Sequence, residues 1–144
     1  MKRFALRAMM IAAIGTAASS PVLAADEDTT CMRHKLDGLY VFSATGYTIV
    51  AGVAQPKAIV ELIRFNGNGT LSVPAATRSI NGVVAASPPG GTGTYTVEAD
   101  CTGTLSFTGG PSFDIFVAPR GDDLWMIQTN ANNVFQGNVT RLSR

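Results

Sequence analysis

The stretch AIVELIRFNGNGTLSV, residues 58–73, carries the clearest fold signal in the chain. Its first half is rich in β-branched and aromatic residues, which are typical of strands, and it ends in the turn sequence NGNG at residues 66–69. The run TLSV then leads away from that turn. Two apolar runs that flank Asn and Gly are a strong short-range signal for a β-hairpin. We therefore expect two antiparallel strands joined by a tight turn.

Strand signals recur on both sides of this hairpin, separated by turn residues. They cover residues 39–42, 79–84, 94–98, 104–108, 113–117, 124–129 and 134–140. The segment AASPPGGTG, residues 85–93, is expected to be an exposed loop, because its prolines lack donors and its glycines add chain entropy. The pattern predicts an all-β fold, an antiparallel up-and-down β-barrel of about eight strands. The alternative is a β-sandwich, which leaves strand edges that a barrel would remove.

The N-terminus has the three parts of a secretory signal peptide. A short cationic start, MKRFALR, precedes an apolar run at residues 8–18 and the small-residue frame Val22-Leu23-Ala24. The apolar run is shorter than the roughly 20 residues that span a bilayer, so we expect cleavage rather than a membrane anchor. The predicted organisation is a signal peptide at 1–24, an N-terminal segment at 25–36 and a single barrel domain at 37–144. The product would be exported, to the periplasm or the extracellular space.

The charge balance excludes two classes of partner. Without residues 1–24 the eleven Lys and Arg fall to eight, while ten Asp and Glu remain, so the formal net charge becomes −2. Nucleic-acid binding and polybasic membrane binding both need clustered cations, and no run of Lys or Arg follows Arg7. We expect neither partner, and the oligomeric state stays open.

Cys31 and Cys101 are the only cysteines. An even count in an exported chain favours a disulfide over a metal site or a nucleophile. We expect the two to pair. The alternative is two separate thiols, because sequence separation does not show that two positions meet in space.

No catalytic residue, metal site or cofactor is predicted. His34 is the only histidine, so neither a Ser-His-Asp nor a Cys-His arrangement has support from other residues. One histidine and two paired cysteines also fall short of the three or four ligands of a zinc site.

Glu61 is the charged residue most relevant to a binding site. In its strand it shares a face with Ile59, Ile63 and Phe65, whereas Arg64 lies on the opposite face. If Glu61 faces the barrel interior, burial raises its pKa and makes it an acid, a base or a polar anchor. The alternatives are that Val60 and Leu62 face inward and Glu61 is solvated, or that the strand bulges.

Several segments together resemble a group of small exported bacterial proteins, mostly described as hypothetical. They are Gly38-Leu39-Tyr40, residues 65–72, Asn81-Gly82 and GTYTVEADCTGT at residues 93–104. The predicted barrel of that group is similar to those of allene oxide cyclase and lipocalin-like proteins. The resemblance covers roughly residues 36–142 and implies a barrel, but no activity, because no catalytic residue of the plant cyclase matches a position here.

Three functions follow as hypotheses. The first is binding of a small apolar ligand inside the barrel, with Glu61 and Tyr40 as ligand-binding residues that fix its orientation. The second is a structural or surface-interaction protein with a filled barrel and no ligand. The third is a cyclase-like or isomerase-like enzyme that acts through groups lining the barrel.

Overall fold

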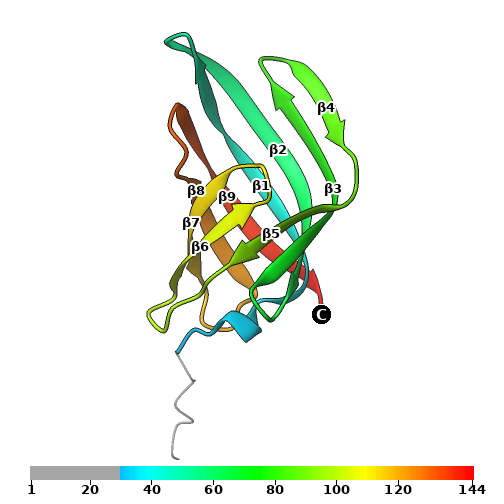
Figure 1. The fold of residues 1–144 in the computed structure, drawn as a ribbon, viewed down its shortest axis with the longest axis vertical. Helices are drawn as coiled ribbons and strands as arrows, with labels where there is room; N and C mark the ends of the chain where they lie inside the picture. Colours follow the sequence, from blue (N-terminus) through cyan, green and yellow to red (C-terminus); the bar gives the residue numbers. More distant parts are fainter. Residues whose placement is uncertain (1–29) are drawn as a thin grey trace, which may run out of the picture.

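A computed structural model describes residues 30–144, and nearly all of their regular structure is β-strand (Figure 1). The predicted signal peptide lies outside the described residues, as do residues 25–29 of the predicted N-terminal segment. In chain order the elements are the 3-10 turn η1 (Arg33–Lys35) and the strands β1 (Asp37–Val50), β2 (Val53–Asn66), β3 (Thr70–Ile80), β4 (Val83–Ser87), β5 (Gly91–Tyr95), β6 (Thr102–Phe107), β7 (Ser112–Val117), β8 (Asp123–Gln128) and β9 (Asn133–Ser143).

The strands form a closed antiparallel barrel. Their order is β2-β1-β9-β8-β7-β6-β5-β3, and a further β2–β3 pairing closes the ring. β4 lies outside this ring as a ninth strand, because β3 pairs with β5 through residues 70–73 and with β4 through residues 76–80. The predicted eight-stranded barrel is confirmed, and the sandwich alternative is wrong.

The hairpin predicted from residues 58–73 is confirmed as β2 and β3, but the neighbouring strand is longer than expected. β1 continues from Phe42 to Val50, and both β1 and β2 have 14 residues. The sequence between Ser43 and Val50 carries little apolar alternation. It stays extended because every residue from Asp37 to Val50 pairs with β2.

The loop predicted for residues 85–93 is largely wrong. Residues 85–87 belong to β4 and residues 91–93 belong to β5, so only residues 88–90 lie between strands. The glycines in β5 are a packing requirement rather than a strand breaker. A Cβ atom on Gly93 would lie 2.5 Å from the Ser106 carbonyl oxygen, which shows how closely β5 and β6 approach.

One end of the barrel, here called the base, is closed by a packed floor. Leu36, which follows η1, is fully buried. Above it the Phe65 ring meets the rings of Tyr40 and Tyr95 edge to face, each at a centroid distance of 5.0 Å. The Tyr95 hydroxyl donates to the Leu36 carbonyl oxygen at 2.9 Å, which fixes the N-terminal segment across the base.

The opposite end, here called the mouth, is formed by hairpins. Figure 1 shows the β1–β2 and β3–β4 hairpins projecting at this end, while η1 and the C-terminus lie at the base. The strands β5 to β8 have only five or six residues each, so the wall opposite these hairpins is lower. The barrel therefore has one high side and one low side around its mouth.

Candidate functional site

The mouth opens into a cavity of about 310 Å³, which we call the cup. Its walls are mainly apolar and include Phe42, Ile59, Val73, Ala76, Phe107, Phe113 and Phe135. Phe42, Phe113 and Phe135 are almost fully buried, and the Phe42 ring contacts the other two edge to face. The upper half of the barrel is thus hollow, although its lower half is filled.

Small side chains on the β3 and β5 walls leave this space open. Ala76, on the inner face of β3, lies directly opposite Glu61 of β2. Gly91, at the start of β5, presents no side chain to the same cavity. At the base, the corresponding inward positions are occupied by tyrosine and phenylalanine rings, so the size of the inward residues decides where the barrel is filled.

Glu61 points into the barrel, which is one of the two orientations that the sequence left open. Its side chain lines the cup and is only 7% exposed, whereas its neighbour Val60 is 55% exposed. Within residues 30–144 the carboxyl group has no hydrogen-bond or ion-pair partner. Burial raises the pKa of Glu61 from its ordinary value of 4.5 to about 7. The cup therefore contains a carboxyl group that is partly protonated at neutral pH and free to meet a ligand.

Tyr40, the other predicted ligand-binding residue, does not line the cup. It lies at the base, where its hydroxyl donates to the Gly121 carbonyl oxygen and accepts from Arg141 Nε at 2.8 Å. Arg141 Nη2 also donates to the carbonyl oxygens of Gly121 and Lys35. Tyr40 thus joins three segments of the chain, and the structure gives it a role in closing the barrel.

Two cationic side chains, Lys57 and Arg78, lie at the rim of the cup. Lys57 Nζ lies 4.1 Å from the centroid of the Phe135 ring and donates to Gln128 Oε1 at 3.0 Å. Burial lowers the pKa of Lys57, and the positive charge of Arg78 lowers it further. Each residue therefore lies close enough to the other for electrostatic repulsion.

The sequence reading missed this pair because the two residues are far apart in the chain. Lys57 precedes the predicted hairpin and Arg78 follows it, so neither belongs to a cationic run. The β2–β3 register brings them to one face, pairing Lys57 with Ile80 and Ile59 with Arg78. Alternation along β2 places Lys57 on the same face as Ile59, but the β2–β3 register shifts between Leu62 and Arg64, so alternation continued from Val73 would have turned Arg78 outward.

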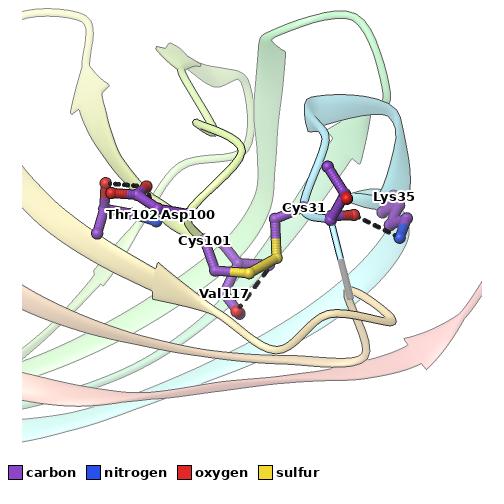
Figure 2. The surroundings of a disulfide bond; sticks show 7 residues. Cys31, Lys35, Asp100, Cys101, Thr102 and Val117 are labelled. Atoms are coloured by element: carbon purple, nitrogen blue, oxygen red, sulfur yellow. Dashed lines mark hydrogen bonds between the residues drawn. A yellow bond between two sulfur atoms is a disulfide. The ribbon is translucent and has the colours of Figure 1, made fainter. Parts of the chain in front are cut away.

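The predicted disulfide between Cys31 and Cys101 is confirmed (Figure 2). It joins the segment before η1 to the turn before β6, with Cα atoms 4.9 Å apart. Cys31 is buried, and the Val117 carbonyl oxygen lies 3.7 Å from its sulfur. Next to Cys101, Asp100 accepts hydrogen bonds from the Thr102 amide and hydroxyl, which stabilises the turn.

A second hollow, of about 510 Å³, lies on the outer surface across β1, β7, β8 and β9. Phe116 and Trp125 form a cross-strand pair there, and each is about half exposed. Ile127 extends the apolar surface, and the amides of Gln136 and Asn138 border it. A surface-interaction function would use this face.

Residues 30–144 contain neither a cluster of metal-ligating side chains nor a membrane-spanning helix. No group of three or more His, Cys, Asp or Glu side chains is placed to hold a metal ion in that part of the chain. No helix within it has the length and apolar content needed to cross a bilayer.

Comparisons with protein-family models, with curated proteins and with solved structures find no match to this chain. The resemblance to exported barrels similar to allene oxide cyclase and lipocalin-like proteins therefore stays a prediction. The candidate site depends on the geometry of the cup alone.

Proposed function

We propose that the protein is an exported carrier or sensor that binds one small, largely apolar molecule in the cup. The observation that carries this proposal is the hollow upper half of the barrel, where the Glu61 carboxyl has no partner among the residues that the structure describes. The cavity volume of about 310 Å³ is at the lower end of the range typical of small-molecule sites. Export agrees with the Cys31–Cys101 disulfide, because such bonds persist in oxidising compartments.

Apolar burial would supply the affinity, and Glu61 would fix the orientation. Each Å² of apolar surface removed from water contributes roughly 25 cal/mol, before the cost of immobilising the ligand. A carboxyl group among phenylalanine rings has few ways to regain the hydrogen bonds that it loses on burial. A hydrogen-bonding group on the ligand would restore one of them and hold the molecule in one pose.

Titration with the neutral dye N-phenylnaphthylamine tests the proposal. We expect saturable binding of one dye per chain, detected by fluorescence. Ala76→Phe places a ring in the cup and should weaken binding by about tenfold or more, because a filled site excludes the dye. Ala75→Phe is the matched control, since the neighbouring Ala75 is exposed and should leave binding unchanged.

Circular dichroism would show that both variants keep the β-fold. An equal loss of dye binding in both variants, or the absence of saturable dye binding to the wild type, would contradict the proposal. Native mass spectrometry of protein purified from its own host would detect a molecule that stays bound.

A second candidate function, an isomerase-like activity, is favoured by Glu61 alone. A carboxyl group with a pKa of about 7 in an apolar cavity is suited to proton transfer at neutral pH. The test is whether a molecule found in the cup is converted by the wild type and left unchanged by Glu61→Gln.

A further inference from the structure

The rim of the cup carries two basic side chains with no acidic side chain beside them among the residues that line it. Lys57 on β2 and Arg78 on β3 point to the inner face, and they are diagonal neighbours because Lys57 pairs with Ile80. Side chains in that relation are within reach of each other when they are long. Both side chains are basic, and both border the entrance.

Within residues 30–144, no carboxylate forms an ion pair with either cation. The amide of Gln128 and the face of the Phe135 ring hold Lys57 in place, and both are neutral. Arg78 is exposed at the rim. Two like charges at the edge of an apolar cavity repel each other, and an anion placed between them would relieve that repulsion.

The interior of the cup is unsuited to an anion. Glu61 lies four residues further along β2 than Lys57, which corresponds to about 13 Å of strand. When ionised, its carboxyl group would repel a second negative charge. The phenylalanine rings that line the cup would not solvate one. The cup therefore differs in polarity along its depth, with cations at the rim and an apolar interior below them.

From this arrangement we infer that the ligand is a monoanionic amphiphile whose headgroup binds between Lys57 and Arg78 while its hydrocarbon body fills the cup. An alkyl carboxylate is the simplest member of this class. The inference rests on the proposed function, because it assumes that the cup holds a ligand. The inference adds the charge of the ligand, the direction from which the ligand enters the cup, and the two residues that select its headgroup.

Three probes with ten-carbon chains separate the two proposals: decanoate, decanol and decyltrimethylammonium. Their affinities are to be measured by isothermal titration calorimetry at low salt and about pH 6.5, where an alkyl carboxylate is ionised and Glu61 is mostly protonated. We expect decanoate to bind about tenfold more tightly than decanol, since a charge-assisted hydrogen bond is stronger than a neutral one. Decyltrimethylammonium should bind more weakly than decanol.

The double variant Lys57→Gln/Arg78→Gln should remove the preference for decanoate and leave decanol binding close to that of the wild type. Arg64→Gln/Arg144→Gln is the matched control, because it also removes two positive charges, from exposed positions outside the cup. It should keep the full preference for decanoate, which separates a local effect at the rim from an effect of net charge.

The possible outcomes distinguish the two proposals. Equal affinity for decanoate and decanol, or a preference that survives the double variant, would overturn the inference and leave the proposed function standing. Absence of binding by all three probes would overturn the proposed function, and the inference with it.

Discussion

The base and the cup are built from the same strands but present different side-chain chemistry to the barrel interior. At the base, Tyr40, Phe65 and Tyr95 fill the space with rings, and the hydroxyl groups of the two tyrosines donate to backbone carbonyl oxygens. In the cup, Glu61 has no hydrogen-bond partner among residues 30–144, and the small side chain of its cross-strand neighbour Ala76 leaves space beside it. Strand number fixes the diameter of a barrel, but this contrast shows that inward side chains decide how much of it is filled.

β2 shows the change along a single strand. Its inward residues, from base to mouth, are Phe65, Ile63, Glu61, Ile59 and Lys57. The first two are buried among other apolar groups, whereas the last three line the cup. One alternating strand thus stabilises the fold at one end and provides the candidate site at the other.

The largest expected effect is at the base, on removal of the disulfide. The bond between Cys31 and Cys101 closes a loop with a sequence separation of 70. Its loss should lower the free energy of unfolding by about 4 kcal/mol in the chain-entropy model. Denaturant unfolding with and without reductant measures this difference. Two titratable thiols in unreduced exported protein would contradict the pairing.

The next effect is in the cup and depends on pH. The folded pKa of Glu61, about 7, is above its ordinary value of 4.5, so between these values the folded chain binds more protons and stability falls as pH rises. The full penalty, about 3 kcal/mol, is present above pH 7 and absent below about pH 4. The free energy of unfolding of Glu61→Gln, relative to that of the wild type, should therefore rise by up to about 3 kcal/mol between about pH 4 and pH 8.

Urea unfolding at the two pH values tests this prediction, with Glu98→Gln as the control at an exposed position. A Glu61→Gln variant whose stability relative to the wild type does not change with pH would show that the carboxyl group is solvated.

The smallest expected effect sharpens the comparison between the two ends. Tyr40→Phe removes a hydroxyl that bonds Gly121 and Arg141 at the base, and it should cost about 2 kcal/mol of stability. Tyr47→Phe, at a half-exposed position near the other end of β1, should cost little. Neither variant should change dye affinity, because neither residue lines the cup. Weaker dye binding by Tyr40→Phe alone would show that the two ends are coupled.

Local patterns were enough to predict the barrel and the face of β2 to which Glu61 belongs, but not that this face points inward. The Asn-Gly turn at residues 66–69 fixes the β2–β3 hairpin, and alternation within β2 places Glu61 on the same face as Ile63 and Phe65. Both depend on neighbours in the sequence. For that reason they can be read without knowledge of the other strands.

The remaining features depend on contacts between distant segments. The extension of β1 beyond Phe42 comes from its pairing with β2 and β9, and not from its own composition. Tyr40 has a predictable inward direction, but its partners Gly121 and Arg141 are 81 and 101 residues away. The rim pair of Lys57 and Arg78 likewise needs the full register of β2 and β3.

The pairing of β1 with β9 has a consequence for the order of folding. The first barrel strand is completed only by the last, from Leu39 opposite Ser143 to Thr48 opposite Asn133. Contacts so distant in sequence are slow to form, typically on the order of milliseconds to seconds. Until β9 pairs, β1 and β8 have open edges that invite association with other chains. During synthesis, the edges of β1 and β8 must therefore be kept from pairing with other chains until β9 has been made.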